Sequence, residues 1–247
     1  MEDLSFYIGV TGNIISVLLF LSPISTFWRI VMHGSTEEYE SLPYICTLLN
    51  SCLWTYYGLV KPGEYLIATI NGFGIIVEAV YVILFLVYAP KHIKAKTTIL
   101  AGILNIGFFG SAVLVTQLAL EGEARINAIG ILGAGLNIIM YGSPLAAMRT
   151  VVRSKSVEYM PFLLSFFIFL NSLIWALYSF LFRDYFLGVP NGIGIVLGLA
   201  QLVLYGMYRN PKASKNAIIV KTSGNAFEED PRQQHEPLIS SAHVSNI

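Results

Sequence analysis

Long apolar stretches recur along almost the whole chain, and they restrict its fold more than any other feature. Runs of about 20 apolar residues follow one another from Phe6 to Tyr208, and a helix of about that length crosses the roughly 30 Å hydrocarbon core of a lipid bilayer. Of the 247 residues, 55% are hydrophobic and 12% are charged, whereas a soluble domain has about 25% charged residues. The sequence therefore predicts an all-α membrane protein that crosses the bilayer several times.

Seven transmembrane helices are expected, joined by short connections that proline, glycine or charged residues mark. Lysine and arginine divide unequally between the two sides, with 12 on one side and only 3, Lys61, Arg125 and Arg183, on the other. The side that is richer in basic residues faces the cytosol in most membrane proteins, so we expect a cytosolic C-terminus and an N-terminus on the opposite side. The expected helices cover residues 6–28, 43–60, 66–88, 98–120, 126–148, 162–182 and 186–208.

Expected helices 1–3 and 5–7 carry the same unusual residues at the same spacing. Most matched pairs lie 120 or 121 positions apart, and Pro43 with Pro161 lies 118 apart, which indicates a local gap. A three-helix unit repeated directly would be inverted in the membrane, but expected helix 4 restores its orientation. The halves should therefore run parallel, related by a pseudo-twofold axis along the membrane normal, with a substrate at the midplane between them. The pairs include Ser22 with Ser143, Pro23 with Pro144, Ser35 with Ser156, Trp54 with Trp175, Tyr57 with Tyr178, Glu64 with Asp184, Asn71 with Asn191 and Tyr88 with Tyr208.

This repeat divides the chain into four parts. We expect two parallel three-helix bundles, over residues 1–90 and 124–210, joined by a linker helix within residues 91–123. Residues 211–247 are polar and have few large apolar side chains. Such a segment cannot bury enough surface to fold, so we expect a disordered cytosolic tail.

An asparagine precedes a tryptophan by four residues at two matched places, Asn50 with Trp54 and Asn171 with Trp175. On a helix, that spacing puts both side chains on one face. A buried amide without a partner costs about 1–3 kcal/mol, so intramembrane amides tend to line a cavity or to bridge helices. Indole faces and amides together suit the C–H faces and hydroxyl groups of a neutral polyhydroxylated molecule. The alternatives are structural hydrogen bonds for the asparagines, including the further pair Asn71 and Asn191, and core or interfacial packing for the tryptophans.

Candidate gating residues lie at both ends of the expected helices. Proline removes a backbone donor and weakens a helix, so prolines at the cytosolic ends could be hinges of a gate. At the other face, Tyr57 and Asp184 could close an outer gate by a hydrogen bond. The alternatives are ordinary helix starts and stops for the prolines and a solvated loop acid for Asp184. The four prolines are Pro23, Pro43, Pro144 and Pro161.

Glu78 is the only acid or base well inside an expected helix. It could be a proton site, but we favour a neutral, hydrogen-bonded structural role. The sequence has no serine–histidine arrangement that would cleave a bond and no glycine-rich phosphate loop. The two cysteines, Cys46 and Cys52, share one expected helix and form no metal-ligand cluster. We therefore expect no enzyme, no metal or other cofactor, and no nucleic-acid partner.

Several segments resemble those of the eukaryotic SWEET sugar transporters, and the resemblance covers residues 5 to about 210. It is strongest to the plant vacuolar branch, whose members move hexoses, notably fructose, across the tonoplast. The segments are Leu21-Ser22-Pro23, Ser35-Thr36-Glu37, Leu42-Pro43-Tyr44, Tyr56-Tyr57-Gly58, Thr69-Ile70-Asn71-Gly72, Lys155-Ser156-Val157-Glu158-Tyr159-Met160-Pro161-Phe162 and Val189-Pro190-Asn191-Gly192.

The resemblance implies facilitated, bidirectional and uncoupled sugar transport by alternating access in a membrane, with the vacuolar membrane favoured over the plasma membrane. It places Asn71 and Asn191 in the sugar site, with Trp54 and Trp175 as stacking walls. It also implies that the four prolines form a cytosolic hinge set and that Tyr57 and Asp184 form the outer gate. Around the pocket it places Ser16, Leu19, Asn50, Met140 and Asn171.

Two departures from the family pattern favour a monosaccharide. Some relatives have a small polar residue at the position of Trp54, and disaccharide carriers tend to have serine where Asn50 and Asn171 stand. The bulkier side chains of this sequence should leave a smaller pocket. Three alternatives stay open: proton-coupled sugar transport through Glu78, a seven-helix receptor or scaffold, and a related carrier of amino or organic acids. Assembly into homo-oligomers, or into hetero-oligomers with related transporters, is also left open.

Overall fold

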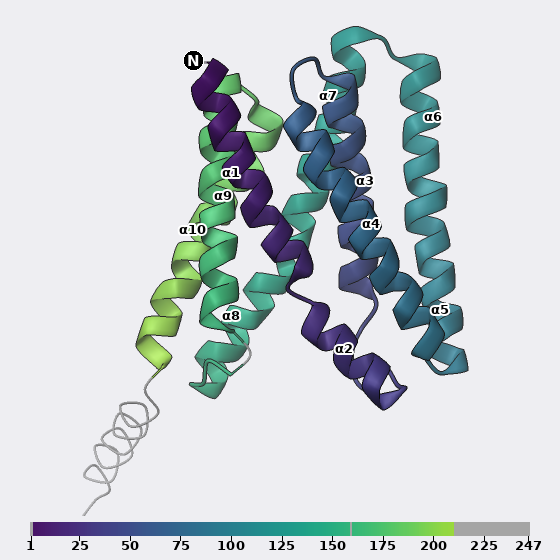
Figure 1. Cartoon of the computed structure of the whole chain (residues 1–247), viewed down its shortest axis with the longest axis vertical. Helices are drawn as coiled ribbons and strands as arrows, with labels where there is room; N and C mark the ends of the chain where they lie inside the picture. The colour runs from purple at the N-terminus through teal and green to yellow at the C-terminus, as the bar shows by residue number, and fades with distance from the viewer. Residues whose placement is uncertain (1, 159, 210–247) are drawn as a thin grey trace, which may run out of the picture. The chain divides into compact units, whose positions relative to one another are not determined.

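A computed structural model describes residues 2–158 and 160–209, and every regular element in this part of the chain is helical (Figure 1). The predicted tail, residues 211–247, lies outside the described residues. The helices form seven segments, of which three contain more than one element. They are α1 (Glu2–Leu21) with α2 (Ile24–His33), α3 (Leu42–Val60), α4 (Tyr65–Tyr88), α5 (Lys91–Ala101) with the π-helix η1 (Gly102–Phe108) and α6 (Phe109–Ala119), α7 (Gly122–Met140) with α8 (Gly142–Ser154), α9 (Phe162–Phe182), and α10 (Tyr185–Tyr208).

Six of these segments are long and apolar enough to cross a membrane, judged by length and composition alone. The exception is α3, whose amides, hydroxyls and aromatic rings lower its mean hydropathy. It lies inside the bundle, where α4, α7 and the linker helix contact it. Seven of its residues are buried, among them Leu49, Leu53 and Trp54.

The outer surface of the helices is apolar, as the membrane prediction requires. Ile106, Leu118 and Phe180 are 77%, 79% and 79% exposed. Large apolar side chains cover far more of this surface than in a soluble protein, where exposed apolar patches are small. A lipid environment satisfies such a surface, so the chain is a multi-pass membrane protein.

The two halves of the chain pack in equivalent ways. Helix α4 contacts α1, α2 and α3, and helix α10 makes the corresponding contacts with α7, α8 and α9. Between the halves, α1 packs on α9 and α7 packs on α3. Figure 1 shows α1 beside α9 on one side, and the linker helix, α5 to α6, at the opposite edge. Helices α4 and α10 are therefore the central helices of their own bundles.

Two helices that the sequence predicts as continuous are broken. The expectation of single helices over 6–28 and 126–148 is wrong at Ser22-Pro23 and at Tyr141, where α1 gives way to α2 and α7 to α8. Pro23 cannot donate a backbone hydrogen bond, and Ser22 Oγ donates instead to the Leu19 carbonyl at 2.7 Å. The Tyr81 hydroxyl of α4 donates to the Phe20 carbonyl at 3.1 Å, which ties this break to the centre of its bundle.

The linker helix is longer than its predicted range of 98–120, since it begins at Lys91. Three hydrogen bonds attach it to the first bundle along its length. Ser41 and Thr97 hydroxyls lie 2.8 Å apart, and those of Tyr56 and Thr116 lie 3.1 Å apart. Between them, Asn105 Nδ2 donates to the Ile45 carbonyl at 3.3 Å.

Candidate functional site

A cavity of about 480 Å³ lies between the two bundles. All nine residues predicted to surround a substrate line it, and they come from six helices, α1, α3, α4, α7, α9 and α10. Its volume falls within the range of small-molecule sites. The nine residues are Ser16, Leu19, Asn50, Trp54, Asn71, Met140, Asn171, Trp175 and Asn191.

The wall formed by α1 and α9 is held by its own hydrogen bonds. Ser16 Oγ donates to Asn171 Oδ1 at 2.7 Å and accepts from Trp175 Nε1 at 3.1 Å. The indole of Trp175 is 6% exposed, so its orientation is fixed by packing as well. Ser16 therefore positions both side chains of the second asparagine–tryptophan motif.

The matching wall, formed by α3 and α7, has free polar atoms. Asn137 of α7 lies 121 positions after Ser16 and also lines the cavity. No hydrogen bond joins it to Asn50 or Trp54 in the described part of the chain, and Asn50 Oδ1 is buried without a partner. An unpaired buried acceptor costs free energy, so this wall has hydrogen-bonding capacity left for a ligand.

Asn71 and Asn191 adopt the same arrangement in the two bundles. Asn71 Nδ2 donates to the Ile67 carbonyl at 2.9 Å, and Asn191 Nδ2 donates to the Leu187 carbonyl at 2.8 Å. An amide has two N–H donors and one carbonyl oxygen. Each asparagine is thus anchored to its own helix and keeps a donor and an acceptor for the cavity.

One end of the cavity, which we call the proline end, is lined by Pro23, Pro43 and Pro144. Pro23 precedes α2, Pro43 lies in the first turn of α3, and Pro144 lies in the first turn of α8. The fourth predicted hinge, Pro161, precedes α9 and is not among the lining residues.

The other end, which we call the gate end, is closed by two crossed hydrogen bonds. The Tyr57 hydroxyl of α3 donates to Asp184 Oδ2 at 2.8 Å, and the Tyr178 hydroxyl of α9 donates to Glu64 Oε2 at 2.8 Å. Both tyrosines are 0% exposed, and Glu64 and Asp184 are 0% and 3% exposed. Each carboxyl precedes the central helix of the bundle opposite its tyrosine, so both bonds join the two halves.

Lys61 links the two carboxyl groups of the gate. Its Nζ lies 2.7 Å from Asp184 Oδ2 and 3.4 Å from Glu64 Oε1, an ion pair without hydrogen-bond geometry. Burial raises the pKa of Glu64 above its ordinary value, while the Tyr178 hydroxyl and Lys61 oppose that shift. Asp184 Oδ1 also accepts from the Leu187 backbone N–H at 3.1 Å, which caps α10.

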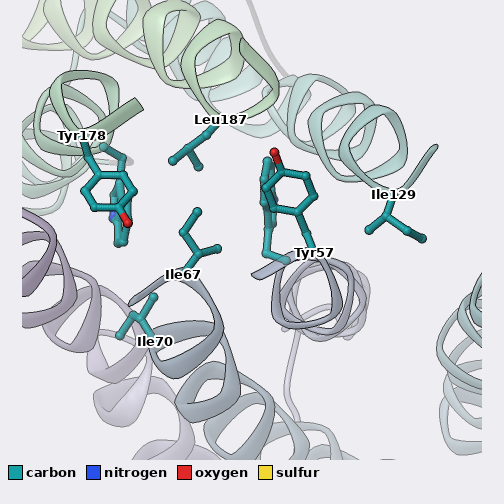
Figure 2. Packing of buried hydrophobic residues seen from close by; sticks show 8 residues of the cluster. Tyr57, Ile67, Ile70, Ile129, Tyr178 and Leu187 are labelled. Carbon is teal, nitrogen blue, oxygen red and sulfur yellow. The ribbon is translucent and has the colours of Figure 1, made fainter. Parts of the chain in front are cut away.

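Two apolar side chains pack between the gate tyrosines. In Figure 2, the side chains of Ile67 and Leu187 lie between Tyr57 and Tyr178. Ile67 and Leu187 are 1% and 6% exposed, and they also line the cavity. These two residues are matched in the repeat, at an offset of 120 positions. The two side chains therefore border both the gate and the cavity.

Sequence reasoning missed half of the gate. The prediction named Tyr57 and Asp184 but neither Tyr178 nor Glu64, although the repeat matched Tyr178 to Tyr57 and Glu64 to Asp184. Applying the pseudo-twofold relation to the predicted bond would have found the second one. Asn137 could have been found in the same way, as the counterpart of Ser16.

Glu78 has no hydrogen-bonded partner in the described residues, contrary to the favoured structural role. It is 3% exposed, it lines the cavity, and its Oε2 atom is buried and unpaired.

Comparison with known proteins shows which family this chain is similar to. A family model described as "Sugar efflux transporter for intercellular exchange" matches residues 6–93 and 127–213. The chain is 58% identical to the bidirectional sugar transporter SWEET17 of Arabidopsis thaliana over 97% of this chain and 100% of that protein. It is 57% identical to SWEET16 of the same plant, over 85% of this chain and 92% of that protein.

A solved structure of a eukaryotic SWEET transporter has the same fold. It superposes with a TM-score of 0.81 at 41% sequence identity, over 84% of this chain and 98% of the other.

Proposed function

The chain belongs to the SWEET family of sugar transporters, and we propose that it carries a hexose such as fructose or glucose through the cavity between its two bundles. It is a facilitative, bidirectional sugar transporter. Membership of the family does not by itself determine the sugar, the residues that bind it or the membrane.

The composition of the cavity wall carries the proposal for the binding site. Asn71, Asn191, Trp54 and Trp175 surround a space whose lining contains no lysine, arginine, histidine or aspartate in the described residues. A neutral sugar needs donors, acceptors and aromatic faces but no opposite charge. Amino and organic acids would require a charged partner, and the cavity offers only Glu78.

The preference for a hexose rests on side-chain volume. Asn50, Asn171 and the two indoles narrow the middle of the cavity, where serine or another small residue would leave more room. We infer that one sugar ring has room between these walls, whereas a second ring would have to extend along the cavity toward the proline end.

The closed gate supports alternating access. We infer that the cavity is reached from the proline end, which we assign to the cytosol because 8 of the 11 basic residues in the described part of the chain lie on that side. Opening of the gate end requires that the bonds of Tyr57 and Tyr178 break, while hinges at Pro23, Pro43, Pro144 and Pro161 close the other end.

The membrane and the assembly are further parts of the proposal. The resemblance to the vacuolar branch supports the vacuolar membrane, which co-localisation of the tagged protein with a tonoplast marker tests. We also propose repeat boundaries at 1–90, 91–123 and 124–210, which truncated variants test. Association of the protein with itself or with related transporters is a further proposal, which native electrophoresis tests.

Counterflow of labelled sugars into liposomes tests the substrate. We expect fructose and glucose to exchange and sucrose to exchange several-fold more slowly. Asn191→Ala should abolish exchange, while Asn105→Ala, which alters an intramembrane amide outside the cavity, should retain it. Equal sucrose and fructose fluxes would overturn the hexose assignment, and full activity of Asn191→Ala would overturn the site.

A further inference from the structure

Glu78 stands out among the cavity residues because its carboxyl group has no partner. Of the residues that line the cavity, it is the only one with an acidic or basic side chain, tyrosines aside. Its Oε2 atom is buried without a hydrogen bond from any described residue. Buried carboxyl groups are normally paired, and one left unpaired lowers stability. A carboxyl kept in this state on a cavity wall suits a ligand that comes from outside the chain.

The position of Glu78 separates it from the central asparagines. Asn71 and Glu78 are seven residues apart on α4, which is two turns, so they share a face about 10 Å apart along the axis. Glu78 is the one nearer the proline end, since α4 runs toward Tyr88 at that end. A solute that enters from the proline end therefore reaches Glu78 before it reaches Asn71.

An aromatic cluster stands beside this carboxyl group. Tyr44 lines the cavity, and its ring is held by Phe27 at 4.8 Å and Tyr81 at 6.0 Å between ring centroids. The carboxyl group of Glu78 lies in the neighbourhood of both Tyr44 and Tyr81. The Tyr81 hydroxyl is engaged with the Phe20 carbonyl, but no described group pairs with the hydroxyl of Tyr44.

The second bundle has no equivalent of this carboxyl group. The matched position on α10 is Gly198, 120 residues later. A Cβ atom there would lie 2.8 Å from Cβ of Phe169, so α9 packs directly against α10 at this level. The feature thus belongs to one bundle alone and lies outside the pseudo-symmetric central site.

We propose that Glu78 and Tyr44 form a second sugar subsite, between the central asparagines and the proline end. This subsite rests on the proposed function, because it takes the same hexoses. The two carboxyl oxygens of Glu78 face the cavity side of α4 and accept hydrogen bonds from neighbouring sugar hydroxyls. The Tyr44 hydroxyl supplies a further donor or acceptor, and its ring borders the sugar.

Equilibrium binding of labelled fructose and glucose to the purified full-length protein tests this subsite. The Asn191→Ala variant removes the central site, so the binding that remains in it reports the Glu78 subsite. We expect residual binding in that variant, weakened about tenfold or more when Glu78→Gln is added and weakened less by Tyr44→Phe. Glu158→Gln, at an exposed acid outside the cavity, is the matched control and should change nothing.

The outcomes separate the two hypotheses. Loss of all binding in Asn191→Ala, or residual binding that survives Glu78→Gln, overturns the subsite, whereas absence of counterflow in the unaltered protein overturns the proposed function. Thermal melting shows whether each variant is folded. If Glu78→Gln does not fold, Glu78→Asp replaces it, because aspartate draws the carboxyl group back by one methylene. Residual binding as strong as with Glu78 then overturns the subsite.

Discussion

Two tyrosine hydroxyls hold the gate end shut, and each reaches into the opposite half of the molecule. Their partners, Glu64 and Asp184, immediately precede α4 and α10, the central helices of the two bundles. A hydrogen bond to a charged group contributes about 1.5–3 kcal/mol. The closed state therefore depends on two matched bonds, with Lys61 between the acceptors.

Removing one of these hydroxyls should open the gate. We expect Tyr178→Phe to raise the ratio of open to closed molecules about tenfold, because one of the two crossed bonds is lost. Tyr57→Phe should act more strongly, since the Tyr57 hydroxyl also accepts from Lys61 Nζ at 3.1 Å. Spin labels at positions 65 and 185, both exposed at the gate end, would report the change as a longer distance. Tyr7→Phe, at an exposed tyrosine, is the control, and an unchanged distance in both gate variants would refute the model.

The walls of the cavity should control the size of the sugar. Replacing Asn50 and Asn171 with serine removes volume from both sides, so the ratio of sucrose to fructose counterflow should rise several-fold. Asn171→Ser also frees Ser16 from its hydrogen bond, so fructose flux should fall in the same variant. A ratio equal to that of the unaltered protein would show that these amides do not limit the pocket.

At the scale of the helices, close approach between neighbours depends on glycine. A Cβ atom on Gly58 would lie 2.7 Å from the Ala68 backbone nitrogen and 2.9 Å from the Glu64 carbonyl oxygen. Both obstacles are backbone atoms, which cannot turn away as a side chain can. Gly58 therefore sets the separation of α3 and the start of α4, next to the gate.

Gly58→Ala should lower the free energy of unfolding by about 1–3 kcal/mol, since the added methyl group overpacks the contact. Thermal melting in detergent measures the loss. The matched control is Gly110→Ala on α6, where an added Cβ meets nothing within 4 Å, and where alanine favours the helix. Equal melting temperatures for the two variants would contradict the packing argument.

Hydropathy and the repeat predicted the helices and the matched asparagines and tryptophans of the cavity, because apolar runs and matched polar residues are local signals. Ser16, Leu19 and Met140 were predicted only by the resemblance to the family. They did not predict the break at Tyr141, where the hydroxyl of Tyr141 donates to the Pro190 carbonyl at 2.5 Å. That contact joins residues 49 positions apart. The bond between Tyr178 and Glu64 was missed for a similar reason, since it requires knowing which helices of the two halves meet.

For the whole molecule, acid pH should favour the closed gate. Burial raises the pKa of Glu64 in the closed state, and water would return it to its ordinary value in an open gate. The closed state then binds the proton more tightly, so protonation stabilises it. This contribution is fully present below the ordinary pKa and is lost as pH rises through the raised one. Asp184, Lys61 and both gate tyrosines face the same carboxyl.

Distances between positions 65 and 185, measured from neutral to acid pH, test whether acid favours the closed gate. The open fraction should fall on acidification, and Glu64→Gln, which is neutral at every pH, should lose that part of the response. An open fraction that grows with acid in the unaltered protein, but not in Glu64→Gln, would reverse the assignment.

Alternating access of one cavity is the central claim, and paired distances at the two ends test it most directly. Spin labels at 65 and 185 report the gate end, and labels at Ile24 and Leu145, matched and half exposed on α2 and α8, report the proline end. In Tyr57→Phe, we expect the gate-end distance to lengthen and the proline-end distance to shorten, with equal populations of the two changes. A gate end that opens while the proline end keeps its distance would contradict the account.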